Sequence, residues 1–248
     1  MDRKVDFIVA GVQKAGTTAL HHFLGQHSGL SLSNMKEVHY FDNEREFEST
    51  PNYNNYHKHF PRIKSNTLRG ELTPIYLYWN DSMRRIYEYN KNMKIIILLR
   101  NPIERAYSHW NMERARNREC YPFYEALINE GQRSRESLPL QHRIFSYVDR
   151  GYYSEQIRRV RRYFKQENIL ILRHELLRDH MSITLTEIAD FLQISPFPVT
   201  LENESIHTGS YKEEIPPIAR EYLIQIFKNE VYTLEEMLHW DCKDWIKQ

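Results

Sequence analysis

Residues 5–20 read VDFIVAGVQKAGTTAL, and this stretch decides the fold. Its first part, Val5 to Ala10, is apolar and rich in β-branched residues, which is typical of a buried parallel strand. A turn with two glycines and two threonines follows, and residues 17–26 predict a helix with an apolar face. The backbone N–H groups of such a turn and of the helix N-terminus converge on one point, so the stretch predicts a cradle for an anion.

Strands and helices continue to alternate along the rest of the chain. Apolar runs predict strands at 94–99 and 169–172, and helical periodicity predicts helices at 103–116, 153–164, 183–192 and 221–238. This alternation predicts an α/β fold, a parallel sheet covered by helices, in a single domain over residues 1–248. Residues 43–69 and 195–215 are rich in loop-forming residues, and we interpret them as insertions over the active face.

Composition excludes several classes of protein. The 34 basic and 33 acidic residues among 248 leave a net charge of +1, which argues against a nucleic-acid partner bound by bulk positive charge. No apolar run approaches the roughly 18–20 residues of a membrane span. Two cysteines cannot by themselves form a disulfide framework or a four-ligand zinc site. The histidine pairs in the sequence are not accompanied by the carboxylates or cysteines of a metal site. Free thiols and a short apolar N-terminal segment predict a cytoplasmic protein.

A second motif follows the most apolar predicted strand, Lys94 to Leu99. Arg100 stands where this strand ends, and the carboxyl ends of parallel strands form the ligand-binding edge of such a sheet. Ser108 lies in the second turn of the next predicted helix. The guanidinium of Arg100 and the hydroxyl of Ser108 predict a phosphate site, with a structural Arg100–Glu104 ion pair as the alternative.

The first turn is not a Walker A loop. That pattern ends in Gly-Lys-Ser/Thr and uses the hydroxyl to hold magnesium, whereas here Lys14 precedes Gly16 and no lysine follows it. An ordinary strand–helix turn is the structural alternative, and the coincidence of Lys14, Gly16, Thr17 and Thr18 favours an anion site over it.

Taken together, the motifs resemble those of sulfotransferases that use 3′-phosphoadenosine 5′-phosphosulfate (PAPS). Residues 14–20 (KAGTTAL) are similar to the 5′-phosphosulfate loop, and residues 99–108 (LRNPIERAYS) to the 3′-phosphate segment. Residues 36–42 (KEVHYFD) and 71–76 (ELTPIY) resemble stretches of heparan-sulfate glucosaminyl 3-O-sulfotransferases. The likeness, shared with bacterial sulfotransferase domains, extends over residues 5–245.

The resemblance implies a sheet of about five strands and a P-loop-like turn that binds the phosphosulfate. It implies transfer of the sulfuryl group of PAPS to a hydroxyl or amine of a glycan or small metabolite, with 3′,5′-bisphosphoadenosine (PAP) as product and no metal. Lys14 is expected to neutralise the negative charge that develops on the leaving group. The expected contacts to the nucleotide are Lys14, Ala15, Gly16, Thr17 and Thr18 at the 5′ end, Arg100 and Ser108 at the 3′ end, and Ser210, Tyr211 and Lys212 in a late loop.

The resemblance places the general base at Glu37, and His39 is the rival candidate. If the stretch is extended, both side chains point the same way, and Asp42 is placed to orient His39. The structural alternative is that Glu37 and His39 are solvated loop residues.

The sequence departs from that of the glucosaminyl 3-O-sulfotransferases at two points. Leu72 replaces the lysine of their Glu-Lys-Thr-Pro stretch, which argues against a heparan-type acceptor, and their disulfide-bearing late loop is missing. The alternatives are a P-loop-type small-molecule kinase or nucleotide hydrolase, and a non-catalytic nucleotide- or glycan-binding module. The acceptor and the oligomeric state are left open.

Overall fold

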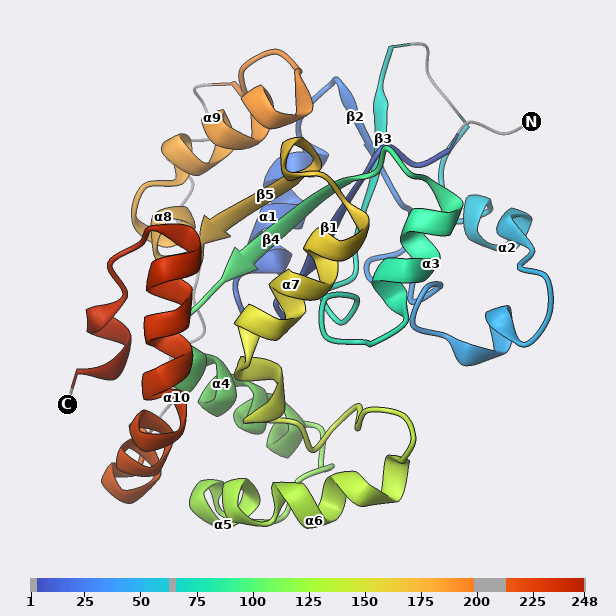
Figure 1. The fold of residues 1–248 in the computed structure, drawn as a ribbon. Helices are drawn as coiled ribbons and strands as arrows, with labels where there is room; N and C mark the ends of the chain where they lie inside the picture. The colour runs from blue at the N-terminus through green and yellow to red at the C-terminus, as the bar shows by residue number, and fades with distance from the viewer. Residues whose placement is uncertain (1–3, 63–65, 199–212, 248) are drawn as a thin grey trace. The chain divides into compact units, whose positions relative to one another are not determined.

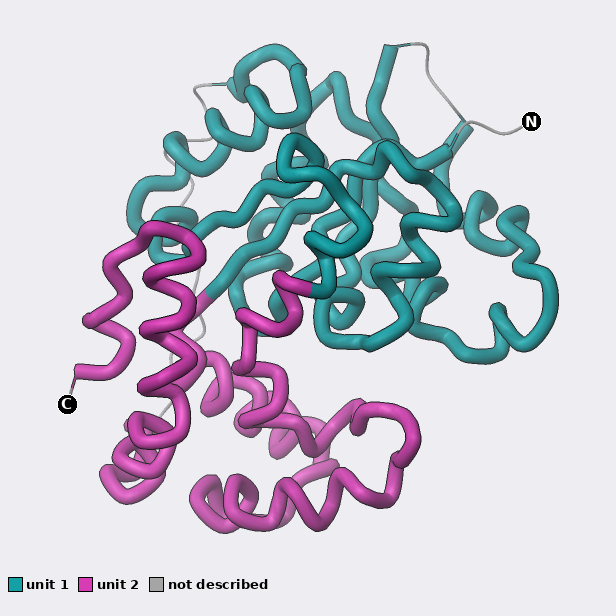
Figure 2. Tube along the Cα trace, in the orientation of Figure 1, with its two compact units in different colours: residues 1–99, 159–207 teal, residues 100–158, 208–248 magenta. Residues whose placement is uncertain are grey.

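A computed structural model describes residues 4–62, 66–198 and 213–247 of the chain (Figure 1). The chain divides into two compact units, each made of two segments (Figure 2). The first comprises residues 1–99 and 159–207, and the second comprises residues 100–158 and 208–248. The single domain inferred from the sequence stays a prediction.

The first unit contains a sheet of five strands within the described residues, and every pairing in it is parallel. The spatial order is β2-β3-β1-β4-β5. This confirms the predicted α/β class with a central parallel sheet. The strands are β1 (Phe7–Gly11), β2 (Leu30–Leu32), β3 (Leu68–Leu72), β4 (Lys94–Leu99) and β5 (Ile169–Arg173).

The central strands are those with the strongest apolar signal in the sequence. All residues of β1 are buried, and β4 is buried from Ile95 onward, as expected for strands with neighbours on both sides and helices on both faces. In the register, Ile8 pairs with Glu71 of β3 and with Ile95 of β4. Because the strands are parallel, their carboxyl ends all meet one edge of the sheet, where ligands of such folds bind.

Helices cover both faces of this sheet. The connection from β1 to β2 contains α1 (Thr17–Gly25), and the connection from β3 to β4 contains α3 (Ser82–Tyr89). These connections run in opposite directions across the sheet, so right-handed crossovers place α1 and α3 on opposite faces (Figure 1). The unit also contains η1 (Glu44–Phe47), α2 (Tyr53–His57), η4 (Gln166–Asn168), α8 (His174–Asp179) and α9 (Met181–Leu192).

Strand β3 begins inside a segment that the sequence predicted to be loop-rich. It reads Leu-Arg-Gly-Glu-Leu, and its charged Arg69 and Glu71 are buried. Both side chains take part in hydrogen bonds: Arg69 Nη2 donates to the carbonyl of Pro61 at 3.0 Å, and Glu71 accepts from hydroxyls described below. These hydrogen bonds allow two charged side chains to be buried in β3, and for that reason the apolar pattern of the sequence does not indicate this strand.

The second unit is helical in its described part. Its core is a cluster of buried apolar side chains that includes Tyr107, Trp110, Phe123 and Phe227. The helices are α4 (Pro102–Ala115), α5 (Phe123–Ile128), α6 (Glu130–Ser134), η2 (Arg135–Ser137), η3 (Asp149–Gly151), α10 (Pro217–Leu238) and η6 (Lys243–Ile246). Helix α7 (Tyr153–Tyr163) begins in this unit and ends in the first.

Candidate active site

The residues of the predicted anion cradle lie between β1 and α1 and in the first turn of α1. Gly16 precedes the first helical residue, Thr17, and supplies no side chain to cap the helix, so the first N–H groups of α1 point toward the turn. The amide of Val12 donates to the carbonyl of Leu98 at 2.8 Å, which ties the start of the turn to β4. The turn thus leads from β1 into the N-terminus of α1, with Lys14 in the turn and Thr18 in the first turn of the helix.

Gly16 is required by both its backbone and its surroundings. Its φ is +86°, a left-handed conformation that side chains with a Cβ rarely adopt. A Cβ on Gly16 would lie 2.9 Å from Nδ1 of His174, the first residue of α8. His174 Nδ1 donates to the carbonyl of Ala15 at 3.0 Å, since that oxygen can only accept. His174 thus holds the turn from the end of β5.

Glu37, His39 and Asp42 meet in the loop that follows β2. His39 Nε2 lies 3.5 Å from Glu37 Oε2, and His39 Nδ1 lies 3.0 Å from Asp42 Oδ2. Asp42 is fully buried, whereas Glu37 and His39 are partly exposed. The imidazole lies between the two carboxylates; His39 is the most exposed of the three side chains, Glu37 is less exposed and Asp42 is buried.

The two carboxylates change the charge state of the imidazole between them. The hydrogen bond to Asp42 and that to Glu37 raise the pKa of His39 from 6.5 to about 9, against the opposing effect of burial. His39 therefore carries its proton at neutral pH and donates from both ring nitrogens. A protonated imidazole cannot accept another proton, and this favours Glu37 over His39 as the base.

Left-handed backbone occurs at the predicted catalytic residues. The φ of Lys14 is +75°, that of Glu37 is +59° and that of His39 is +55°. The condition under which both side chains would point the same way, an extended segment, is not met at Glu37 and His39, and the two side chains meet nevertheless. Non-glycine residues in this region cost of order 1–3 kcal/mol each and are frequent at functional sites.

Lys36 joins the loop of Glu37 to the anion turn. Its Nζ donates to Thr18 Oγ1 at 2.7 Å and lies 3.9 Å from Glu37 Oε1. The structure therefore brings two groups of predicted residues together, those of the turn and those of the loop. The sequence analysis gave Lys36 no role; its position directly before Glu37 was the available signal.

A buried carboxyl group lies at the end of β3. Glu71 Oε1 accepts from the hydroxyls of Tyr56 at 2.6 Å and Tyr76 at 3.2 Å, and Oε2 accepts from Thr73 Oγ1 at 2.6 Å. Burial raises the pKa of Glu71 to about 7, although the three hydrogen bonds act in the opposite direction. No role for Glu71 was predicted from the sequence.

Arg100 and Ser108 belong to the second unit, Arg100 just before α4 and Ser108 in the second turn of that helix. Asn101 caps this helix, its Oδ1 accepting from the amide of Ile103 at 2.9 Å, and Pro102 occupies the first turn. The carbonyl of Arg100 accepts from the hydroxyl of Tyr153 at 2.9 Å, and Ser108 is buried. Glu104, the alternative partner of Arg100, accepts from Arg220 at 2.8 Å.

The remaining predicted contacts, Ser210, Tyr211 and Lys212, lie outside the described residues. Across residues 4–62, 66–198 and 213–247, no three histidine, cysteine, aspartate or glutamate side chains are grouped so that they could hold a metal ion. Within that same part of the chain, no helix is both long and apolar enough to cross a bilayer.

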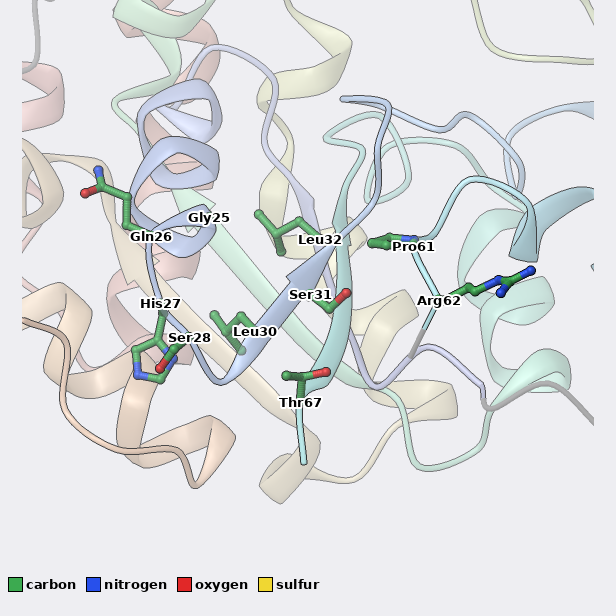
Figure 3. Close-up of a pocket in the computed structure, with 10 residues that line it drawn as sticks. All are labelled: Gly25, Gln26, His27, Ser28, Leu30, Ser31, Leu32, Pro61, Arg62 and Thr67. Atoms are coloured by element: carbon green, nitrogen blue, oxygen red, sulfur yellow. The ribbon is translucent and has the colours of Figure 1, made fainter. Parts of the chain in front are cut away.

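A pocket of about 390 Å³ opens at the other end of α1 (Figure 3). Its lining comes from the end of α1, from β2 and from the segment before β3, and includes Gln26, His27, Ser31 and Arg62. Residues 14–18 and 37–42 do not line it, so this pocket is separate from the anion turn.

The first unit is an α/β fold in which Lys36 connects the loop of Glu37 to the first turn of α1. The chain belongs to the sulfotransferase domain family, whose model matches residues 4–214. It is thus an enzyme of the sulfotransferase class, and the predicted family is confirmed.

The chain is also similar to curated proteins that are named as sulfotransferases. The chain is 32% identical over 211 residues to human bifunctional heparan sulfate N-deacetylase/N-sulfotransferase 2, and 33% identical over 208 residues to N-deacetylase/N-sulfotransferase 1 of Xenopus laevis. These alignments cover 79% and 78% of this chain and 23% of each relative. The chain therefore matches about a quarter of the length of these bifunctional proteins.

Solved structures share the fold. A sulfotransferase from Alicyclobacillus acidocaldarius has a TM-score of 0.84 at 24% identity, covering 99% of this chain and 100% of that one. Mouse sulfotransferase SULT7A1, solved with PAP, has a TM-score of 0.61 at 13% identity, covering 96% and 89%. Both likenesses support the α/β fold.

Proposed function

We propose that this chain transfers the sulfuryl group of PAPS to an amine or hydroxyl of a carbohydrate or small-molecule acceptor, with Glu37 as the general base. The observation that carries the proposal is the contact of Lys36 with both Thr18 and Glu37, because it sets a carboxylate beside the turn expected to hold the phosphosulfate.

Each residue of the turn has a chemical task in this reaction. The acceptor's nitrogen or oxygen attacks sulfur, the bond from sulfur to the bridging oxygen breaks, and its electron pair goes to the 5′-phosphate of PAP. Lys14 neutralises the charge that grows on this leaving group, while the amides of residues 15–18 and the hydroxyls of Thr17 and Thr18 bind the phosphate. The 3′-phosphate is assigned to Arg100 and Ser108, with Ser210, Tyr211 and Lys212 as further contacts.

Glu37 accepts the acceptor's proton as the new bond forms. His39, held protonated by Asp42, and Lys36 on the other side compensate the negative charge of this carboxylate. The sulfuryl group carries less charge than a terminal phosphoryl group, so the chemistry calls for no divalent metal to neutralise it.

The acceptor class to test first is an amine-bearing polysaccharide. The human and frog relatives are named heparan sulfate N-sulfotransferases, which supports an amino sugar. Leu72, which stands where the resembling 3-O-sulfotransferases have lysine, argues against a heparan-type acceptor, but its side chain is buried in β3 and offers an acceptor no contact.

The test is a transfer assay with radiolabelled PAPS and a chelator. The acceptors are N-desulfated heparan sulfate, the same polysaccharide with its amines acetylated, and a panel of small alcohols and amines. Label in any acceptor supports the proposal, and label confined to the free-amine polysaccharide assigns N-sulfation. Tight PAP binding without transfer to any acceptor would indicate a binding module instead. Turnover of ATP that requires magnesium would indicate a kinase or hydrolase.

A further inference from the structure

Tyr76 lies in the segment 71–76, which the proposed reaction does not use. Its hydroxyl both donates and accepts hydrogen bonds. The Tyr76 hydroxyl donates to Glu71 Oε1 at 3.2 Å. It accepts from the amide of Tyr40 at 2.9 Å and from that of Phe41 at 3.4 Å. A tyrosine hydroxyl has one proton to donate and can accept from two donors, and the side chain of Thr73 is a further hydrogen-bonding neighbour of this hydroxyl.

The two amides belong to the loop that carries the base. Tyr40 and Phe41 lie between His39 and Asp42, whose side chains pair at 3.0 Å. Glu37 and His39 are held in left-handed backbone, which is unfavourable for residues with side chains. Such a loop keeps its conformation only when its surroundings impose it, and the hydroxyl of Tyr76 is one such restraint.

Tyr76 is itself tied to the strand that leads into the anion turn. On either side of it, the amide of Thr73 donates to the carbonyl of Val9 at 3.2 Å, and the amide of Leu77 donates to the carbonyl of Ala10 at 2.8 Å. The approach is close, because a Cβ on Gly11 would lie 2.7 Å from Cβ of Leu77. Through these bonds Tyr76 has a fixed position relative to β1.

We propose that Tyr76, held in place by Glu71, is a positioning residue that sets the Glu37 loop at its distance from the anion turn. This inference rests on the proposed function, since it concerns where the base lies relative to the sulfuryl donor. The buried carboxylate keeps the hydroxyl proton of Tyr76 directed inward, so both acceptor positions face the loop amides.

The matched control is Tyr56. Its hydroxyl is as deeply buried and donates to the same Glu71 oxygen, at 2.6 Å. In the described part of the chain, the Tyr56 hydroxyl bonds to Glu71 and to neither loop amide. Tyr76→Phe and Tyr56→Phe therefore each remove one bond to Glu71, and the first also removes the link to the loop.

Two measurements test the proposal on these variants. In Tyr76→Phe we expect kcat to fall about 10- to 100-fold with the KM for PAPS and the Kd for PAP nearly unchanged, because a base displaced by about 1 Å slows the reaction by up to that factor. In Tyr56→Phe we expect kcat to stay near that of the unmodified protein. Amide hydrogen exchange at Tyr40 and Phe41 is expected to accelerate in Tyr76→Phe alone.

Unchanged kcat and unchanged amide exchange in Tyr76→Phe would overturn the proposal. Equal losses in both variants would overturn it too, since they would reflect general packing. If the unmodified protein transfers label to no acceptor, the proposed function fails, and the exchange at Tyr40 and Phe41 still decides whether Tyr76 restrains the loop.

Discussion

The amino group of Lys36 donates to the hydroxyl of Thr18 at 2.7 Å, and this bond connects the end of one loop to the first turn of α1. Because the lysine is the donor in this bond, the hydroxyl hydrogen of Thr18 is not used in it. If the turn binds the phosphosulfate as proposed, Lys36 is a second cation beside it, in addition to Lys14.

Replacing Lys36 with methionine should weaken PAP binding about tenfold, because a charge-assisted hydrogen bond contributes about 1.5–3 kcal/mol and the side chain is partly exposed. Isothermal titration calorimetry measures the Kd. Lys165→Met, at an exposed lysine, is the control and should bind PAP normally. An unchanged Kd in Lys36→Met would show that this cation contributes nothing to the anion site.

Glu37→Gln should lower kcat by about 10²–10⁴-fold, the usual contribution of a general base, while PAP binding is retained. The amide keeps the size of the side chain and loses the ability to take a proton. Transfer of label from PAPS gives kcat, and calorimetry gives the PAP affinity. Glu48→Gln, at an exposed position, is the matched control. Turnover near that of the unmodified protein would eliminate Glu37 as the base.

The pKa of His39 can be measured directly. Its imidazole should titrate near pH 9 by NMR, and Asp42→Asn should bring the midpoint back toward 6.5. Because the pKa is raised in the folded protein, the contribution of His39 to stability is complete below pH 6.5, declines between 6.5 and about 9, and is lost above. Urea unfolding of the unmodified protein and of His39→Gln across this range should converge at high pH. A midpoint near 6.5 in the unmodified protein would contradict the geometry.

Gly16→Ala should lower the free energy of unfolding by about 1–3 kcal/mol and weaken PAP binding, because the new Cβ meets left-handed backbone and the ring of His174. Urea unfolding measures the first effect and calorimetry the second. Gly131→Ala is the control, since a Cβ there meets nothing within 4 Å and the residue is helical. Equal stability of the two variants would mean that the turn relaxes without strain.

The fold could be predicted where burial requires apolar residues. The central strand β4 (Lys94–Leu99) has the predicted bounds, and β1 and β5 differ from the prediction by one or two residues at their ends. Strand β3 had no such signal, because buried Arg69 and Glu71 depend on partners distant in sequence. Strand β2 (Leu30–Leu32) is too short for a periodic pattern to appear.

The candidate residues of the site could be named from the sequence, and their geometry could not. The turn residues were named from their types and order, and Glu37 from the resemblance to sulfotransferases; their chemical roles stay predictions. The left-handed backbone of Glu37 and His39 could not be predicted, because nothing in their side chains demands it. His174 supports Ala15 from 159 residues away, a relationship that a single sequence does not reveal. Ser210, Tyr211, Lys212, the cytoplasmic location and the roles of Arg100 and Ser108 stay predictions.

The path of the chain through the sheet has a consequence for synthesis on the ribosome. Strand β4 pairs with β1 on one side and β5 on the other, and residues 100–158 of the second unit are made between β4 and β5. Until β5 emerges, β4, the most apolar strand of the nascent polypeptide, has an unpaired edge. Unpaired strand edges promote aggregation of incomplete chains. Translation arrested before Ile169 should therefore yield a product that depends on chaperones, whereas the finished chain closes that edge itself.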